Sequence, residues 1–448
     1  MCAQADSCET SWKHLPPCDA YFCSGNSNKE AHLTDRLPSV DSDFFRQNRP
    51  KQKMSVTSKR GGPRDTVEES WDEHILAQCY SLARRVTVKD FLDRFKSFLG
   101  ISGRMWAATS GRSALRDALA GTRGHTGGPK KSVLICSFNC VAVGEAVLQA
   151  GFLAETFDLS DRSGRIDWDG IARQLRSDHH AIVVPHLFGV PSDFRPILHA
   201  AANLGVLVIE DCAHTLGGNI GDAVTGTLGD MAVYSFTYNK AISLGGGGAL
   251  VVNNTELEQL IQLPEREISR DCEMKEIKRF VAYLRGRRGQ LERPSISRRI
   301  RRRLFPRGIT GQELMPTAGF GPLRAALGMW ELDHYEPTCD QRNRNASHFS
   351  SIPHWRAWHV SDNVSPAWLM QKVVPVQPVD VVKISHSLQA LGLRVGAFNW
   401  PMTLDRFLSF PERPNASYVA TYGLDIPVHQ AMEGKELQLI LNTLKSYH

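Results

Sequence analysis

The spacing of apolar positions predicts a helix early in the patterned part of the chain. Within Val86–Gly100, the residues Val88, Phe91, Phe95 and Leu99 recur every three or four positions. That spacing places them on one face of a helix, and the glycine after Leu99 is typical of a helix C-terminus. We therefore expect an amphipathic helix that buries this face.

Residues 1–70 have a different character. They mix serine, asparagine, proline and charged residues without regular spacing of apolar positions. A segment of this composition buries too little apolar surface to offset the entropy lost on ordering. We expect a poorly ordered leader, of which the part before Met54 is dispensable, and a folded part that begins near Trp71.

Short apolar runs then alternate with helical stretches. The runs typical of buried strands are Ser132–Phe138, Ala181–Phe188, Gly205–Asp211, Met231–Phe236 and Gly248–Asn253. The stretches with helical spacing between them are Gly111–Gly121, Val143–Gly151 and Ser192–Gly205. Strands that are apolar on both faces and separated by helices predict an α/β domain, in which a mostly parallel sheet carries helices on both faces.

The pattern changes after Asn254. Pro322–Ile352 has the spacing of one or two helices, a mixed region follows, and Met432–His448 is amphipathic. A chain of 448 residues is long enough for two or three domains. We therefore expect a large α/β domain at 71–255 and a smaller α+β domain at 256–448.

The positive charge of the chain is concentrated in one segment. The formal net charge is +6, but residues 285–307 hold ten arginines and one acid, a net charge of +9, so the remaining residues carry −3. Nucleic-acid-binding proteins spread basic residues over one face of a domain, and the chain as a whole does not fit that class. For this basic insert three interpretations stay open: a solvated surface segment, a clamp for a diphosphate or other anionic substrate, and a contact with a membrane surface or nucleic acid.

Other features point to a cytoplasmic enzyme. No apolar run approaches the ~20 residues of a membrane span, and the N-terminus lacks the basic and then apolar pattern of a secretory signal. The ten cysteines form no CxxC pair, and Cys136 and Cys140 lack a second pair of ligands. We therefore expect reduced thiols and no metal site.

Polar residues follow the predicted strands. Asp211 ends one run and His214 comes three residues later, whereas Ser235 closes the next run and Lys240 lies just beyond it. The carboxyl ends of parallel strands are where functional residues gather in open sheets. A carboxylate after an apolar run also needs a partner, because burial of an unpaired charge is costly.

A candidate anion site lies upstream of these residues. Gly111, Arg112 and Ser113 open a predicted helix. The N-terminus of a helix offers unpaired N–H groups and the positive end of the helix dipole, and both favour a phosphate.

An anion site, an acid and a lysine together match the needs of pyridoxal 5'-phosphate. Its phosphate needs a helix N-terminus, its ring nitrogen needs a carboxylate, and its aldehyde needs a lysine. Taken one at a time, Asp211 is equally explained as a structural cap and Lys240 as a surface lysine, and the glycines at 245–248 as a tight turn. From the residues alone, these alternatives stay open.

At these residues the chain resembles the sugar aminotransferases of the DegT/DnrJ/EryC1/StrS group, which are fold type I pyridoxal phosphate enzymes. The likeness runs from about residue 75 to the C-terminus. It is carried by VVPHLFGVPSDF at 183–194, VLVIEDCAHTLGG at 206–218 and GTLGDMAVYSFTYNKAISLGGGGALVVNN at 226–254. The resemblance implies the α/β fold of that group, with a smaller C-terminal domain.

The resemblance also implies roles for single residues. Lys240 matches the Schiff-base lysine, and Asp211 matches the acid that pairs with the pyridine nitrogen. His214 stands at a Gln/His position near the ring oxygen of the cofactor, and Ser235 matches a phosphate-binding serine. We expect Lys240 and Asp211 to be catalytic and all four residues to contact the cofactor.

The remaining expected contacts include departures from the pattern of the family. Gly111, Arg112 and Ser113 fall in the phosphate-binding loop, and Cys140 falls where an aromatic residue normally stacks on the ring. Gly321 stands where an asparagine of the neighbouring subunit normally reaches the phosphate. Arg112 is our candidate to offset that loss through a charge-assisted contact.

The implied activity is amino transfer. The resemblance implies that an amino acid, expected to be glutamate, gives its amino group to a keto sugar in sugar or secondary-metabolite biosynthesis. A nucleotide-linked sugar is the expected acceptor and a keto-cyclitol an alternative, and a homodimer with active sites at its interface is implied. A sugar dehydratase, which carries histidine in place of Lys240, and a non-catalytic binding or regulatory relative stay open as rival interpretations.

Overall fold

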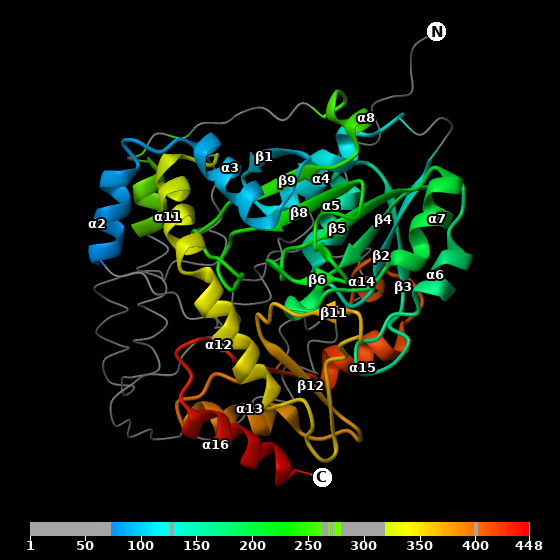
Figure 1. Cartoon of the computed structure of the whole chain (residues 1–448). Helices are drawn as coiled ribbons and strands as arrows, with labels where there is room; N and C mark the ends of the chain where they lie inside the picture. The colour runs from blue at the N-terminus through cyan, green and yellow to red at the C-terminus, as the bar shows by residue number, and fades with distance from the viewer. Residues whose placement is uncertain are drawn as a thin grey trace, which may run out of the picture.

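The computed structural model describes residues 73–125, 130–261, 268, 270, 272–278, 319–397 and 402–447. The predicted leader at 1–70 and the basic insert at 285–307 lie outside these residues. In Figure 1 a large sheet with its helices lies above a smaller part, which is formed by the C-terminal region of the chain and has a sheet of its own.

A seven-stranded sheet forms the centre of the larger part, in the order β1-β9-β8-β5-β4-β2-β3. Its strands are β1 (Arg104–Ala108), β2 (Ser132–Cys136), β3 (Leu153–Phe157), β4 (His179–Pro185), β5 (Leu207–Asp211), β8 (Met231–Ser235) and β9 (Gly248–Val252). Neighbours from β3 to β8 are parallel, whereas β9 is antiparallel to both β8 and β1. The predicted α/β class with a mostly parallel sheet is confirmed.

The strands that the apolar pattern did not predict, β1 and β3, are the two edges of this sheet. Arg104 in β1 and Leu153 in β3 are exposed, and Glu155 in β3 is only partly buried. An edge strand has a neighbour on one side only, so it needs fewer apolar side chains than a central strand. In β3 Glu155 and Thr156 interrupt the apolar pattern, and in β1 the apolar run Met105–Ala108 is too short to stand out.

Helices cover both faces of the central sheet. They are α2 (Glu73–Leu82), α3 (Val88–Leu99), α4 (Gly111–Gly121), α5 (Val141–Gln149), α6 (Trp168–Gln174), α7 (Arg195–Leu204), α8 (Thr255–Glu258) and α11 (Pro322–Asp333). Alternate strand residues point to opposite faces: Val133 and Ile135 pack with α4 and α5, whereas Leu134 packs with α6 and α7. On the second face, α3 and α11 cover β8 and β9.

Helix α3 follows the prediction from its sequence. Phe91, Phe95 and Leu99 are fully buried on one face. Thr87 opens the helix by accepting a hydrogen bond from a backbone N–H of the first turn, and Gly100 ends it in the left-handed conformation, at φ 65°.

The smaller part contains a four-stranded sheet in the order β10-β12-β14-β13. Its strands are β10 (Trp355–Ala357), β12 (Gln371–Pro375), β13 (Gly396–Ala397) and β14 (Leu424–Ile426). Its helices are α12 (Tyr335–Ser347), α13 (Val381–Ala390), α14 (Leu404–Phe407), α15 (Pro414–Tyr422) and α16 (Gly434–Lys445). Figure 1 shows α11 and α12 leading from the larger part to this sheet, and the predicted boundary near 255 stays a prediction.

Two further contacts join the parts. Strand β11 (Val364–Ser365) pairs with β6 (Asn219–Ile220), which pairs with β7 (Ala223–Val224). The backbone N–H of Leu404 in α14 donates to Ser137 after β2, at 2.9 Å. The edge of the central sheet that carries the predicted chemistry therefore lies beside the smaller part.

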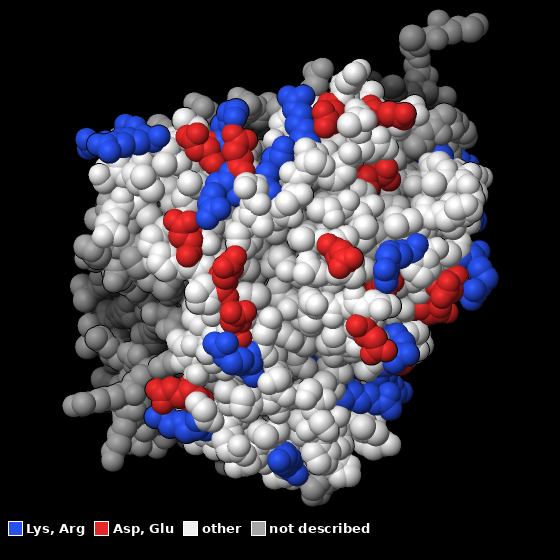
Figure 2. Space-filling model, viewed as in Figure 1, with Lys and Arg blue, Asp and Glu red and all other residues white. Residues whose placement is uncertain are grey.

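The surface of the described residues is mixed in charge. In Figure 2 basic and acidic side chains are interspersed over the face that is drawn. This distribution agrees with the near-neutral charge of the chain outside its basic insert. None of the described helices has the length and apolar character needed to span a membrane.

Candidate active site

A pocket opens at the carboxyl edge of the central sheet. Its walls come from the ends of β4, β5 and β8, the N-terminus of α4 and the segment that leads into α5. It is lined by Ser110, Gly111, Arg112, Leu115, Asn139, Cys140, Ala142, Val143, His186, Leu187, Phe188, Asp211, Ala213, His214, Val233, Ser235, Thr237, Tyr238, Asn239, Lys240 and Met370. Of the predicted site residues, the pocket brings together all except Ser113.

The N-terminus of α4 forms one end of this pocket. Ser110 caps the helix by accepting a hydrogen bond from the N–H of Ser113 at 3.1 Å, and the hydroxyl of Ser113 accepts from the N–H of Ser110 at 3.0 Å. Ser113 therefore stabilises the helix start and is not among the residues that line the pocket, and its contact with the cofactor stays a prediction. Gly111 allows close packing, because a Cβ there would lie 3.0 Å from the Cβ of Ser235.

Two hydroxyls at the end of β8 stand opposite this helix start. The Oγ of Ser235 lies 3.1 Å from the Oγ1 of Thr237. Hydroxyls beside the N–H groups of a helix N-terminus are the groups that bind a phosphate. Thr237 was not singled out from the sequence, although its place two residues after Ser235 could have indicated it.

Arg112 reaches the pocket as half of an ion pair. Its Nη1 lies 3.2 Å from the Oε2 of Glu145 in α5, and the side chain of Glu145 is 5% exposed. Removing two charges from water costs several kcal/mol unless each compensates the other. Glu145 therefore offsets much of the charge that Arg112 brings, and the contact of Arg112 with a phosphate stays a prediction.

Asp211 ends β5 with a buried carboxylate, 8% exposed. Its Oδ1 accepts a hydrogen bond from the N–H of Ala213 at 3.1 Å, and its Oδ2 lies 3.5 Å from the Nδ2 of Asn139. We expected a buried acid at this position to have a partner. One of its partners is the side-chain amide of Asn139, which we did not identify from the sequence.

His214 is held as a neutral imidazole. Burial, and after it the positive charge of Lys240, lowers the pKa of His214 well below its usual value. The backbone N–H of Phe188 donates to Nδ1 at 3.4 Å, so the proton of the ring is on Nε2. Phe188 itself has φ 61°, a left-handed conformation that is rare for an aromatic residue.

Lys240 lies on a loop that folds back on the end of β8. The carbonyl of Phe236 accepts from the N–H groups of Leu244 at 2.8 Å and Gly246 at 3.2 Å. Gly245, Gly246 and Gly247 have φ 67°, 136° and 95°, and none of them lines the pocket. The glycine run therefore forms a tight turn that returns the chain to β9, and it does not cradle a phosphate.

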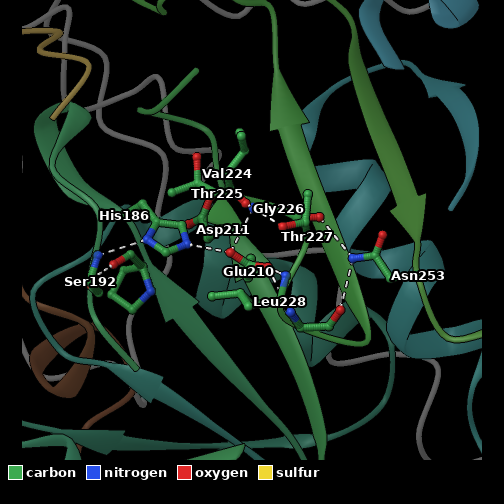
Figure 3. A network of polar contacts seen from close by, with 12 residues as sticks. His186, Ser192, Glu210, Asp211, Val224, Thr225, Gly226, Thr227, Leu228 and Asn253 are labelled. Atoms are coloured by element: carbon green, nitrogen blue, oxygen red, sulfur yellow. Dashed lines mark hydrogen bonds and ion pairs between the residues drawn. The ribbon is translucent and has the colours of Figure 1, made fainter. Parts of the chain in front are cut away.

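A second acid, Glu210, precedes Asp211 in β5 and lies at the centre of a network of polar contacts (Figure 3). Its carboxylate accepts from the N–H groups of Gly226, Leu228 and Gly229, each at 2.8 Å, and lies 2.9 Å from the Nε2 of His186. In Figure 3 His186 lies on one side of Glu210 and the turn around Gly226 on the other. Each partner donates a hydrogen bond to the carboxylate, so the buried charge of Glu210 is compensated.

This network also bears on metal binding. Among the described residues, His186, Glu210 and Cys212 bring potential ligand atoms within 4.8 Å of one another. Both ring nitrogens of His186 are engaged, since Nδ1 accepts from the N–H of Ser192 at 3.0 Å. Burial raises the pKa of the Cys212 thiol well above its usual value. Metal binding needs a thiolate and free lone pairs, and this cluster offers neither.

The pocket residues fit pyridoxal phosphate. A helix N-terminus with two hydroxyls, a buried carboxylate, a neutral histidine and a lysine meet in one place. Of the two departures from the family pattern, Cys140 lines the pocket without offering a ring, and Gly321 is not among its lining residues. The N–H of Gly321 instead donates to Glu273 at 2.9 Å.

The chain is similar to curated proteins over part of its length. The chain is 34% identical over 154 residues to the UDP-N-acetyl-3-dehydro-alpha-D-glucosamine 3-aminotransferase of Acidithiobacillus ferrooxidans, which covers 34% of this chain and 41% of that relative. It is 30% identical over 213 residues to the GDP-perosamine synthase of Caulobacter vibrioides, which covers 47% of this chain and 55% of that relative. The chain thus aligns with about half the length of these relatives.

Solved structures share the fold. A sugar aminotransferase from Micromonospora echinospora matches with a TM-score of 0.64 and 19% identity, over 86% of this chain and 98% of that one. A Helicobacter pylori aminotransferase involved in pseudoaminic acid biosynthesis matches with a TM-score of 0.66 and 16% identity, over 86% and 98%. The model of one family matches residues 75–445, and the chain belongs to that family, the DegT/DnrJ/EryC1/StrS aminotransferases.

Proposed function

We propose that the protein is a pyridoxal phosphate-dependent aminotransferase that transfers the amino group of an amino acid, glutamate, to a nucleotide-linked keto sugar. The observation that carries this proposal is the meeting of Asp211, His214, Ser235 and Lys240 with the N-terminus of α4 in one pocket. The names of the relatives, a UDP-sugar aminotransferase and a GDP-perosamine synthase, support the substrate class.

Each residue has a definite task in this proposal. The N–H groups at Gly111 and the hydroxyls of Ser235 and Thr237 bind the phosphate. The carboxylate of Asp211 holds a proton on the ring nitrogen, and the Nε2–H of His214 donates to the ring oxygen without adding charge. When bound, pyridoxal phosphate supplies the aldehyde that exchanges amino groups and a ring that withdraws electrons.

Lys240 has two tasks. Its ε-amine would hold the cofactor through the aldehyde carbon, and once displaced by the amino donor the free amine would take the proton from the α-carbon of the donor and return it to the carbon of that aldehyde. Burial is the main cause of the lowered pKa of His214 and the charge of Lys240 is the second, which supports the closeness of Lys240 to the ring-binding residues.

Borohydride reduction tests the covalent task. Wild-type protein reduced in the presence of pyridoxal phosphate should carry the cofactor on the peptide that contains Lys240, as detected by mass spectrometry. Lys240→Ala should carry none there and should lose turnover by at least a thousandfold. A variant that transaminates at the wild-type rate would show that another group performs the chemistry.

A panel of acceptors tests the substrate class. Nucleotide-linked 3-keto and 4-keto sugars and cyclitol ketones are each offered with glutamate, and the aminated product is measured. We expect the nucleotide-linked sugars to react fastest. Loss of a sugar hydroxyl without amine transfer would indicate the dehydratase, and cofactor binding without turnover would indicate a non-catalytic relative. The homodimer stays a prediction that analytical ultracentrifugation tests.

A further inference from the structure

We infer that Asn139 is a positioning residue of this site, whose side-chain amide holds one carboxylate oxygen of Asp211. The inference rests on the proposed function, because it assigns to Asn139 an effect on the group that Asp211 binds. Neither residue type nor spacing suggested this asparagine, and it follows from contacts among the described residues.

The orientation of the Asn139 amide is set by its neighbour. The N–H of Cys140 donates to the Oδ1 of Asn139 at 2.7 Å. This bond directs the amide oxygen toward the backbone, so the amide NH2 must point the other way. Asn139 is 2% exposed, and a buried amide NH2 needs an acceptor.

That acceptor is Asp211. The Nδ2 of Asn139 lies 3.5 Å from Oδ2, a long hydrogen bond, while the N–H of Ala213 holds Oδ1 at 3.1 Å. Each oxygen of the carboxylate therefore has its own donor. A buried carboxylate gains more from such donors than a neutral acceptor does, because they compensate its charge.

The contact is not local. Asn139 follows β2 and Asp211 ends β5, and β4 lies between these strands in the sheet. The asparagine therefore reaches across the end of a strand to the acid, and both side chains line the pocket. If Asn139 served only to start α5, its hydrogen bond with the N–H of Cys140 would be sufficient, and the contact with Asp211 would have no role. The amide thus fixes the plane of the Asp211 carboxylate, and with it the direction in which Asp211 meets a bound ring nitrogen.

A double-mutant cycle separates the two roles. Asn139→Asp keeps an oxygen that accepts from Cys140, but it replaces the donor with a second acid facing Asp211. The affinity of the apoprotein for pyridoxal 5'-phosphate is measured by titration for wild type, Asn139→Asp, Asp211→Asn and the double variant. We expect Asn139→Asp to weaken binding at least tenfold in the wild-type background and less than twofold beside Asp211→Asn.

Two further variants serve as an alternative and as a control. Asn139→Ala, taken through the same cycle, gives the same comparison without a like charge, should Asn139→Asp fold poorly. Asn345→Asp is the matched control, because Asn345 is equally buried and donates to the carbonyls of Val428 at 3.2 Å and His429 at 2.9 Å. It should lower the urea midpoint and leave the affinity for pyridoxal phosphate unchanged.

The outcomes are distinguishable. Equal losses from the Asn139 variants in both backgrounds would overturn the inference, since Asn139 would then act through the loop and not through Asp211. Full affinity in the Asn139 variants would overturn it as well. If wild-type protein does not bind pyridoxal phosphate, the proposed function fails.

Discussion

His214 shows how one side chain can be a donor without being a cation. Burial and the charge of Lys240 keep its pKa well below the usual value, and the N–H of Phe188 occupies Nδ1. The ring therefore presents Nε2–H across the neutral pH range. A carboxamide can also present an N–H without charge, whereas a phenyl ring cannot.

This difference gives a prediction. His214→Gln should bind pyridoxal phosphate within about threefold of wild type, and His214→Phe should bind at least tenfold more weakly, because a hydrogen bond contributes about 1 kcal/mol or more at a buried site. Fluorescence titration at pH 6, 7 and 8 measures both. Equal losses in the two variants would show that Nε2–H is not used.

His180, remote from the pocket, makes stability depend on pH. It is fully buried, its Nε2 lies 2.9 Å from the Oγ1 of Thr122, and its ring stacks on Phe152 at 4.3 Å. Burial, followed by the positive charges of Lys130 and Arg123, lowers its pKa from 6.5 to about 4. Between these values the unfolded chain binds more protons than the folded protein.

The free energy of unfolding should therefore fall as the pH is lowered from about 6.5 to about 4. In His180→Gln the slope over this window should be shallower, whatever the stability at pH 7. Urea unfolding at half-unit steps of pH measures the slope. Identical slopes in the two proteins would exclude His180 as a source of acid sensitivity.

The sequence could indicate the place of residues that follow an apolar run. Asp211, Ser235 and Lys240 come at or just after the ends of central strands, and that position can be seen in the chain. Asn139 could not be found in the same way, because its partner is 72 residues away and their contact depends on the order of β5, β4 and β2. For Ser113 the sequence could not decide between a ligand and the helix cap, because a serine in the first turn can serve either.

Among the elements, the start of α11 is organised by an acid from another segment. The carboxylate of Glu273 accepts from the N–H groups of Gly321, Leu323 and Arg324, at 2.9, 2.7 and 3.1 Å. These are the N–H groups that a helix leaves unpaired in its first turn. The N-cap residue Gly321 has no side chain that could accept these bonds, and Glu273 accepts them instead. The carboxylate of Glu273 therefore fills the space beside Gly321.

Replacing Gly321 should therefore destabilise the protein. A Cβ there would lie 2.6 Å from the Oε2 of Glu273 and 2.6 Å from the Cγ2 of Ile268. We expect Gly321→Ala to cost about 1–3 kcal/mol, measured by urea unfolding. Gly434→Ala is the control, because it also lies at a helix start and a Cβ there meets nothing within 4 Å. If both variants unfold at the wild-type urea concentration, the prediction is wrong, because Glu273 can then move away from Cβ without cost.

At this scale the sequence pattern predicted central strands and amphipathic helices, and it failed at edges. The edge strands β1 and β3 lack a long apolar run, because Met105–Ala108 is short and Glu155 and Thr156 interrupt β3. The short ladder between β6 and β11 was equally invisible, since two-residue strands contain no period. Edge and short elements depend on pairing contacts that the local sequence does not show.

In the whole molecule, a buried ion pair of the smaller sheet contacts two aromatic rings of the larger part, and one of them, Phe188, lines the pocket. The Nζ of Lys372 in β12 lies 2.9 Å from the Oδ1 of Asp425 in β14, with the two side chains 3% and 0% exposed. The same ammonium lies 5.7 Å from the ring centre of Phe138 and 5.5 Å from that of Phe188. A cation over two aromatic faces holds the loops after β2 and β4 against the smaller sheet.

This arrangement predicts a marked asymmetry between single and double replacement. Lys372→Met keeps the length of the side chain but removes the ammonium from a buried carboxylate, and it should cost about 3–5 kcal/mol. Lys372→Met with Asp425→Val removes both charges, and it should return most of that loss because neither charge then needs compensation. Thermal and urea unfolding measure the two variants beside wild type. A double variant as unstable as the single one would mean that Lys372 stabilises the protein through Phe138 and Phe188 and not through its ion pair with Asp425.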